Sequence, residues 1–199
     1  MNLSPLSATL DNNSNNNDNS NTIQPCMDQR IVKPSPSASH SERPEQLEAI
    51  ELRLLLAEQQ STTAANSVAA AYLVLLGLLT VAPEMPMRSL RETLANVCRR
   101  GTIVVVVDRI SHVLCGAGTV FVEQKLIHCG GTVAHIEDIV VHERYRRRGV
   151  GSMVLGTLEK IANESGSYKA ILNCTADNAN FYGRAGFKNK GVVQMSKYF

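Results

Sequence analysis

The residues best suited to chemistry form one short run, Arg-Arg-Arg-Gly-Val-Gly at Arg146–Gly151. The preceding sequence, Val133–Val141, favours a β-strand, and apolar residues recur at helical spacing over Val150–Ile161. The run therefore predicts a turn between a strand and the start of a helix. Unpaired N–H groups at a helix N-terminus carry partial positive charge, and glycines let an anion approach the backbone. We expect a phosphate site here; a basic, solvated turn that opens an ordinary surface helix is the alternative.

A second group of candidate residues lies on the preceding strand and on a later helix. The alternation of inward and outward side chains along Val133–Val141 breaks near Asp138, which predicts a β-bulge. A bulge leaves backbone N–H groups off the ladder, and one near Val140 can then stabilise an oxyanion. Tyr182, on the predicted helix Asp177–Ala185, can give a proton to a departing group; a packed aromatic with a satisfied hydroxyl is the alternative.

The N-terminal half of the chain favours helices that must support this site. Arg43–Gln60 is helix-prone, although its part Ile50–Leu56 is the best position for a first strand. Ser61–Pro83 has no charged residue, and we interpret its apolar stretch as a core helix because it is too short to span a bilayer. Prolines end this helix at Pro83, and a second helix is predicted over Met87–Arg99.

The C-terminal half favours strands. Thr102–Val107 is a β-branched run typical of a strand covered on both faces, and Val113–Glu123 continues it as an antiparallel hairpin. The strand that begins at Val133 is joined by a helix to Tyr168–Cys174, so these two strands should be parallel. A last strand is predicted over Val192–Phe199. The order of elements indicates an α+β domain with a mixed sheet.

The composition suits one folded domain behind a polar tail. The chain has 199 residues and a formal net charge of +2, which gives no general argument for nucleic-acid binding. Residues 1–42 are rich in Asn, Ser and Pro and cannot offset their ordering entropy, so we expect a disordered tail before a domain at 43–199. The five cysteines lack C-x-x-C spacing and the histidines lack ligand spacing, which indicates a reduced intracellular protein without a metal site.

The pattern Arg-x-x-Gly-x-Gly between a strand and a helix resembles the coenzyme A pyrophosphate loop of the GNAT acetyltransferase superfamily. From Thr102 to the C-terminus the chain further resembles the glucosamine 6-phosphate N-acetyltransferases, small dimeric enzymes of that superfamily. The segments that carry this resemblance are Glu123–His128, Ala134–Val141, Arg146–Gly151, Tyr168–Cys174, Asn178–Phe187 and the pair Leu79–Thr80. The resemblance implies the GNAT fold, a mixed, mostly antiparallel central sheet flanked by helices.

The resemblance also implies a reaction. Acetyl-CoA, as co-substrate, would give its acetyl group to the amine of D-glucosamine 6-phosphate by direct attack in a ternary complex. The product would feed UDP-N-acetylglucosamine biosynthesis. The resemblance implies a homodimer that acts on a small amino sugar phosphate. We expect this protein to be cytoplasmic, and from its composition and spacing we expect no metal, no nucleic-acid partner and no stable membrane insertion.

Site residues follow from the same resemblance. Catalytic roles fall to Tyr182, Glu137 and Asp138. The residues expected to bind the coenzyme are Ile139, Val140, Val141, Arg146, Arg147, Arg148, Gly149, Val150, Gly151, Ser152, Asn178 and Tyr182. The residues expected to bind the sugar phosphate are Thr80, Lys125, Leu126, Ile127, His128, Glu137, Asp138, Ile139, Tyr168, Lys169 and Asn173.

The sequence departs from the family pattern at two substrate positions. Asn173 stands where some members carry an acidic residue that attracts the sugar ammonium across the dimer, and Thr80 lacks the glycine that commonly follows it. Two other functions therefore stay open beside the acetylation of glucosamine 6-phosphate. One is a GNAT acetyltransferase for another amine, such as a peptide or a different small molecule. The other is a non-catalytic module that only binds acetyl-CoA.

Overall fold

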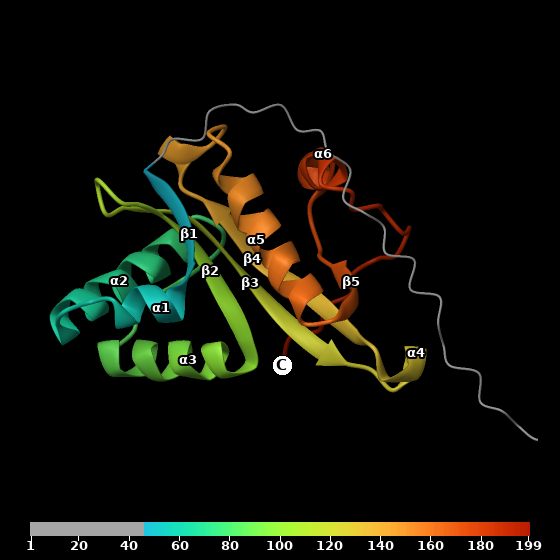
Figure 1. The fold of residues 1–199 in the computed structure, drawn as a ribbon, viewed down its shortest axis with the longest axis horizontal. Coiled ribbons are helices and arrows are strands. Elements are labelled where there is room, and N and C mark those ends of the chain that lie inside the picture. The colour runs from blue at the N-terminus through green and yellow to red at the C-terminus, as the bar shows by residue number, and fades with distance from the viewer. Residues whose placement is uncertain (1–45) are drawn as a thin grey trace, which may run out of the picture. The chain divides into compact units, whose positions relative to one another are not determined.

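A computed structural model describes residues 46–199 of the protein (Figure 1). The tail predicted over residues 1–42, and its boundary with the domain, lie outside the described residues. In chain order the elements are β1 (Leu47–Glu51), α1 (Leu52–Ala57), α2 (Thr62–Leu76), α3 (Met87–Arg100), β2 (Gly101–Asp108), β3 (Leu114–Gln124), α4 (Ile127–Gly130), β4 (Thr132–Val141), the 3-10 helix η1 (Glu143–Tyr145), α5 (Val150–Glu164), β5 (Ser167–Ile171) and α6 (Ala176–Arg184).

The five strands form one sheet in the order β1-β2-β3-β4-β5. Neighbours from β1 to β4 are antiparallel, and β5 lies parallel to β4 because α5 connects them as a crossover. The predicted hairpin, parallel pair and mixed sheet are therefore confirmed. β2 is buried from Ile103 to Asp108, as its β-branched run predicted for a strand with both faces covered.

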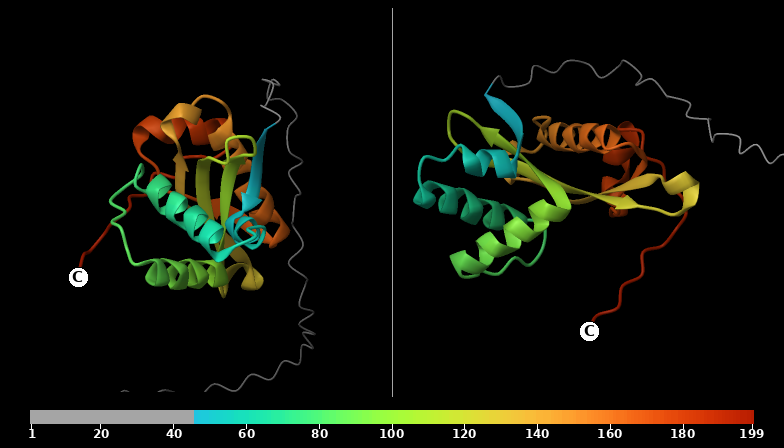
Figure 2. Two further views of the ribbon diagram at one scale, coloured as in Figure 1. Left: turned by 90° about the vertical axis from the view of Figure 1, so that its left-hand side faces the viewer. Right: turned by 60° about the horizontal axis from the view of Figure 1, so that its bottom comes forward.

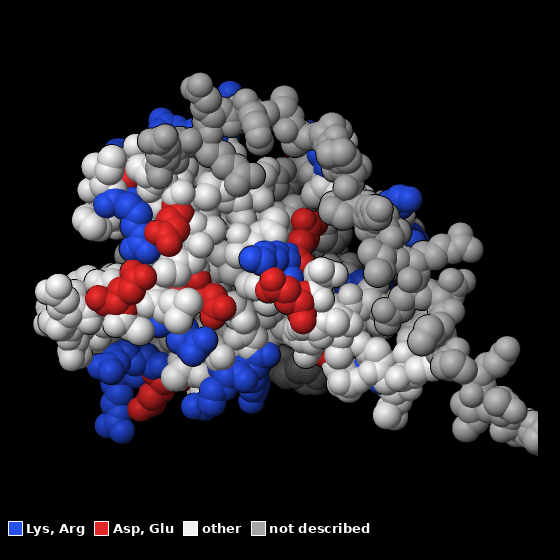
Figure 3. Space-filling view, viewed as in Figure 1, with Lys and Arg blue, Asp and Glu red and all other residues white. Residues whose placement is uncertain are grey.

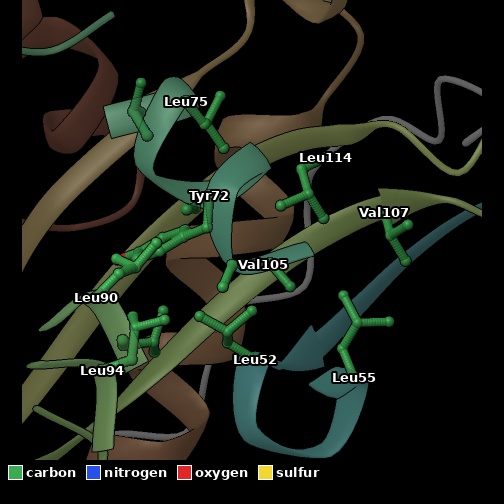
Figure 4. Close-up of a cluster of buried hydrophobic side chains, with 13 residues drawn as sticks. Leu52, Leu55, Tyr72, Leu75, Leu90, Leu94, Val105, Val107 and Leu114 are labelled. Atoms are coloured by element: carbon green, nitrogen blue, oxygen red, sulfur yellow. The ribbon is translucent and has the colours of Figure 1, made fainter. Parts of the chain in front are cut away.

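Helices cover the two faces of the sheet because successive strand residues point to opposite sides (Figure 2). Ile103, Val105 and Val107 pack with leucines of α1, α2 and α3 in one cluster, part of which Figure 4 shows. Val104 and Val106 face the other way and pack against α5. The sheet is therefore the middle layer, and its inner strands are inaccessible from either side.

Two glycines of β3 set the depth at which α5 lies on the sheet. A Cβ at Gly118 would come within 2.8 Å of Leu158 Cδ1 and of Val154 Cγ1, and one at Gly116 would come within 2.6 Å of Val150 Cγ1. Side-chain carbons do not approach so closely, so α5 needs glycine at both positions. This close approach lowers the N-terminus of α5, where the predicted phosphate site begins, onto the sheet.

The helix predicted over Arg43–Gln60 is wrong in its first part. Leu47–Glu51 forms β1, and only Leu52–Ala57 is helical; the strand also begins earlier than Ile50–Leu56 would place it. On the side away from β3, the buried N–H and C=O groups of β2 need hydrogen-bond partners. β1 supplies these partners by pairing antiparallel with β2. This pairing outweighs the helix propensity of Leu47–Glu51.

Ion pairs of Arg109 hold the same N-terminal segment. The guanidinium contacts the carboxylates of Glu48 on β1 and of Glu58 after α1, the second at 3.0 Å. Elsewhere the surface charges are mixed. Figure 3 shows Lys and Arg gathered mostly over α3, with acidic side chains among them.

The apolar helix is shorter and less buried than expected. Ser61 caps its start by accepting a hydrogen bond from the Ala64 N–H, and α2 ends at Leu76, before Gly77 rather than at Pro83. Only Ala69, Tyr72 and Leu75 are buried, and Val74 is 73% exposed, so the prediction of a core helix holds for one face. Within residues 46–199 no helix is both long and apolar enough to cross a membrane.

The strand predicted over Val192–Phe199 is wrong for this chain alone. These residues have no regular secondary structure, and the apolar side chains of Val192, Val193, Met195, Tyr198 and Phe199 are all at least 82% exposed. A strand needs a neighbouring strand to pair its backbone groups. In the described part of the chain, β5 pairs only with β4, so this segment has β-favouring residues without a partner.

We predict that Gly118→Ala destabilises the fold by about 1–3 kcal/mol because the added methyl group overpacks against Leu158 and Val154. Denaturant unfolding measures the change. The matched control is Gly156→Ala on α5, where a Cβ meets nothing within 4 Å. That variant should gain up to ~1 kcal/mol from helix propensity. Equal free energies of unfolding for the two variants would contradict the conclusion that Gly118 sets the depth at which α5 lies on the sheet.

Candidate active site

A β-bulge in β4 forms one wall of the candidate site. Ala117 pairs with Val140 and Thr119 pairs with Glu137, so Asp138 and Ile139 together lie opposite the single residue Gly118. Asp138 has a φ of 54°, a left-handed conformation that is unusual for a residue with a side chain. The predicted bulge is therefore confirmed, and it turns the strand at the position expected for ligand contact.

The other side of β4 is open at the same level. β5 pairs with β4 only from Thr132 to His135, whose partner is Ile171. Beyond His135 the strand has no neighbour on that side within the described residues. On this unpaired stretch Ile139, Val140 and Val141 line a groove, and their N–H and C=O groups that face away from β3 need other partners. A bound ligand can complete the hydrogen bonds that β5 does not make.

The groove has a volume of about 600 Å³ and runs between the bulge, the start of α5, and α6. Of the described residues that line it, three are arginines and none is acidic, so its electrostatic potential favours an anion. The lining consists of Leu78, Leu79, Ile139, Val140, Val141, Arg146, Arg147, Gly149, Gly151, Ser152, Asn178, Phe181, Tyr182 and Arg184.

The basic loop has the shape of an anion-binding turn. Gly149 is the N-cap residue of α5 with a φ of 79°, and Arg147 has a φ of 62°. Two left-handed residues on either side of Arg148 fold the loop tightly. Gly151 permits contact with the next helix, since a Cβ there would lie 3.3 Å from Phe181 Cζ.

Two of the three loop arginines line the groove, and the third does not. Arg146 and Arg147 line the groove, and Arg146 Nε lies 3.5 Å from the Val141 carbonyl oxygen. Arg148 instead stacks on Tyr145, with Cζ 5.5 Å from the ring centroid. Val150 is buried beneath the loop. The predicted coenzyme residues Arg148 and Val150 can thus contribute backbone groups, while their side chains lie outside the lining.

Tyr182 is held in the groove by aromatic contacts. Its ring meets Phe181 edge to face, with centroids 4.9 Å apart, and meets Phe187 in the same way at 6.2 Å. Burial, followed by the nearby Cys174, raises the pKa of the phenol above its ordinary value. The hydroxyl therefore stays protonated near neutral pH. A fixed, protonated phenol beside backbone N–H groups can serve as a proton donor.

The predicted sugar-phosphate residues on the β3–β4 hairpin lie far from this groove. Lys125, Leu126, Ile127 and His128 precede the start of β4, whereas the bulge is near its end. At about 3.3 Å per residue the two regions are ~20 Å apart along the strand.

Near the start of β4 the hairpin does meet β5. The His128 and Tyr168 rings are 4.6 Å apart, and Lys169 Nζ lies 5.5 Å from the Tyr168 ring centroid. Lys125 forms an ion pair with Glu123, which also contacts His135. Part of the predicted substrate set is therefore assembled, but not at the groove of the same chain.

The remaining predicted residues, Glu137, Asp138, Asn173 and Thr80, are not among those that line the groove. Glu137 is half-buried and Asp138 is exposed, both at the bulge. Asn173 is exposed after β5, and Thr80 follows the lining residues Leu78 and Leu79 without lining the groove itself.

Arg184 and Phe181 are groove residues that the sequence analysis missed. Both lie on α6 with Asn178 and Tyr182. Positions three and four apart share a helix face, so spacing from Asn178 and Phe181 would have indicated Arg184. Its position at the last residue of the helix hid that signal, because a basic residue there is ordinary.

A smaller cavity of about 210 Å³ lies beside Glu51, Arg53 and Cys98, away from the bulge and the loop. Within residues 46–199 no group of three or more His, Cys, Asp or Glu residues is placed to hold a metal ion.

Comparison with known proteins links this geometry to a family. Residues 79–187 match the model of the Acetyltransferase (GNAT) family. The glucosamine 6-phosphate N-acetyltransferase of Schizosaccharomyces pombe is 38% identical over 96 residues, which are 48% of this chain and 86% of that protein. The probable glucosamine 6-phosphate N-acetyltransferase 2 of Oryza sativa subsp. japonica is 37% identical over 134 residues, or 64% of this chain and 80% of that protein.

A solved structure agrees with these relatives. The crystal structure of glucosamine-6-phosphate N-acetyltransferase from Arabidopsis thaliana has a TM-score of 0.67 and 28% sequence identity, covering 78% of this chain and 99% of that chain. The matched family model spans more than half of the sequence and includes the bulge, the basic loop and α6. This chain belongs to the acetyltransferase (GNAT) family.

Proposed function

We propose that this protein transfers the acetyl group of acetyl-CoA to the amine of D-glucosamine 6-phosphate, giving N-acetyl-D-glucosamine 6-phosphate for UDP-N-acetylglucosamine biosynthesis. The observation that carries the proposal is the groove that joins a cationic α5 loop to the bulge of β4 and to Tyr182. Relatives at 37% and 38% identity are named for this activity, which supports the choice of amine.

The coenzyme fits the groove by charge and by shape. The pyrophosphate would accept hydrogen bonds from backbone N–H groups of Arg148–Ser152, with Arg146 and Arg147 adding charge. Its pantetheine arm would run along β4 where β5 is absent and pair with the open backbone groups, as an added strand does. Asn178 faces the same groove and can bind an amide of the arm. This path brings the thioester to the bulge.

Acetyl transfer then needs three events at that point. A neutral amine attacks the thioester carbonyl, and a backbone N–H near Val140 stabilises the oxyanion that forms. Glu137 and Asp138 attract the sugar ammonium and can take its proton, directly or through water. When the C–S bond breaks, Tyr182 donates its proton to the departing thiolate, and the acetylated nitrogen returns its extra proton through water to the Tyr182 phenolate. Placement of both substrates side by side in a ternary complex supplies further acceleration.

We also propose that the enzyme is a cytoplasmic homodimer. The hairpin residues assigned to the sugar phosphate lie ~20 Å along β4 from the bulge, so a second chain would have to bring such residues to each groove. Leu126 is fully exposed and Ile127 is 65% exposed at the hairpin tip, and the apolar segment Val192–Phe199 is unpaired. Burial of these side chains in a dimer would remove a large apolar surface from water.

Light scattering tests this assembly. We expect twice the chain mass of 21.7 kDa, and a shift toward the single mass when residues 192–199 are deleted. A measured mass equal to that of one chain, for the full-length protein at micromolar concentration, would contradict the dimer.

The experiment that tests the function is release of free thiol from acetyl-CoA by the purified protein. Release that depends on glucosamine 6-phosphate, and not on glucosamine, galactosamine 6-phosphate or a short peptide, is the expected result. Release with a different amine would keep the acetyltransferase and change its substrate, with Asn173 as the first residue to examine. Coenzyme binding without release for any amine would leave a binding module.

We predict that Tyr182→Phe lowers kcat about 10²-fold and leaves the Kd for CoA within about twofold, because only the proton donor is lost. Since the pKa of Tyr182 is raised, the loss should be the same between pH 7 and 9. Tyr198→Phe is the matched control and should keep wild-type kcat, because it removes only a hydroxyl outside the groove and keeps the ring that the proposed dimer would bury. An unchanged kcat in Tyr182→Phe would remove Tyr182 from the mechanism.

Substitutions of Arg147 separate the cost of its left-handed backbone from the contribution of its cation to acetyl-CoA binding. A left-handed conformation costs an ordinary residue about 1 kcal/mol, and asparagine tolerates it better than most residues. We predict that Arg147→Asn and Arg147→Ala both weaken acetyl-CoA binding about tenfold through loss of the cation. Arg147→Asn should be more stable than Arg147→Ala by up to ~1 kcal/mol. Calorimetric titration and denaturant unfolding measure the two effects; unaltered coenzyme binding in either variant would contradict the role.

A further inference from the structure

Asp108, at the end of β2, is a buried acid outside the groove. The residue is 5% exposed, and one carboxylate oxygen, Oδ1, accepts hydrogen bonds from the N–H groups of Ile110 at 2.9 Å and Ser111 at 3.1 Å. Arg109, next to it, is committed to Glu48 and Glu58. Asp108 therefore closes the β2–β3 turn through backbone donors and has a second oxygen left for another partner.

That second oxygen, Oδ2, contacts Tyr145, the residue that precedes the Arg146–Gly151 loop. The Tyr145 hydroxyl donates to Asp108 Oδ2 at 3.2 Å, and Ser111 Oγ lies 3.5 Å from the same hydroxyl. The Ser111 N–H above all, with the Ile110 N–H and the Tyr145 hydroxyl, holds the pKa of Asp108 below its usual range in spite of burial. The carboxylate is therefore charged near neutral pH, and a charged acceptor makes the stronger hydrogen bond.

Tyr145 in turn fixes the side chain at the centre of the loop. The guanidinium of Arg148 lies over its ring, and His142 meets the ring edge to face with centroids 5.9 Å apart. Arg148 stands between the left-handed residues Arg147 and Gly149, so the position of its side chain constrains the turn. With Arg148 drawn back onto Tyr145, the groove side of the turn is left to backbone N–H groups.

Resting on the proposed function, we propose that Asp108 is a positioning residue for coenzyme binding, which acts through Tyr145 and Arg148 to hold the Arg146–Gly151 loop in its anion-binding shape. A loop already held in the bound conformation loses less conformational entropy when the coenzyme binds. The β2–β3 turn thus contributes to affinity although neither Asp108 nor Tyr145 lines the groove.

The test measures binding of CoA itself by calorimetric titration, with no amino sugar present. Tyr145→Phe removes the hydroxyl and keeps the ring under Arg148, and Asp108→Ala removes the acceptor Oδ2 without supplying a group that could donate to the Tyr145 hydroxyl. Each should raise the Kd for CoA about tenfold. Both substitutions remove the same hydrogen bond. The Kd of the double variant for CoA should therefore be no higher than the higher of the two single-variant Kd values. Tyr145→Leu also loses the ring and should bind more weakly than Tyr145→Phe.

A purely structural role would change stability without this pattern. Leu94→Ala, in the core cluster on the opposite face of the sheet, is the control that lowers Tm while keeping the wild-type Kd for CoA. In Tyr145→Phe we expect kcat at saturating acetyl-CoA and the KM for the amino sugar to stay within about twofold of wild type.

Several results would overturn the proposal. A wild-type Kd in Tyr145→Phe, or strictly additive losses in the double variant, would do so. A wild-type chain that bound no CoA would end this proposal and the proposed function together. A wild-type chain that bound CoA without acetylating glucosamine 6-phosphate would overturn only the proposed substrate, and the Kd series would still decide the role of Asp108.

Discussion

The separation of β4 from β5 is the constraint on which the site depends. The two strands pair only as far as His135 and Ile171, and the bulge at Asp138 and Ile139 then turns β4 away. Buried backbone N–H and C=O groups must find partners, so a strand that loses its neighbour inside a domain requires a substitute. Here the open side of β4 faces a groove. The missing pairing thus creates both the space for an extended ligand and the hydrogen-bonding groups that hold it.

The second requirement is that α5 lies deep enough to aim its N-terminus at the same groove. Gly116 and Gly118 of β3 remove the side chains that would lift the helix, and Val150 and Val154 fill the space that results. The loop before the helix then needs left-handed backbone at Arg147 and Gly149. Glycine adopts that conformation freely, whereas arginine does so at a cost. The strain lies where a cation lines the groove, which is where binding can compensate for it.

Several elements form only because of neighbours distant in sequence. Leu47–Glu51 is a strand because β2 offers an unpaired edge, although its composition favours helix. Val192–Phe199 has the residues of a strand and remains irregular because it pairs with none of the strands in residues 46–199. Both cases show the same rule: strand formation is decided by a partner, and the residues of the strand supply only the preference. Helices α3 and α5 satisfy their own backbone groups and agreed closely with their predicted spans.

The sequence by itself determined the order of the main helices and strands, the bulge, the basic strand-to-helix turn and the α6 face that carries Asn178 and Tyr182, because periodicity and turn chemistry are local. Only the tertiary structure decided which of these residues share a groove. It placed Arg184 there, turned Arg148 away onto Tyr145, and put Lys125–His128 at the opposite end of β4. Strand pairing, helix depth and side-chain direction depend on contacts between distant segments, and spacing along one chain does not contain that information.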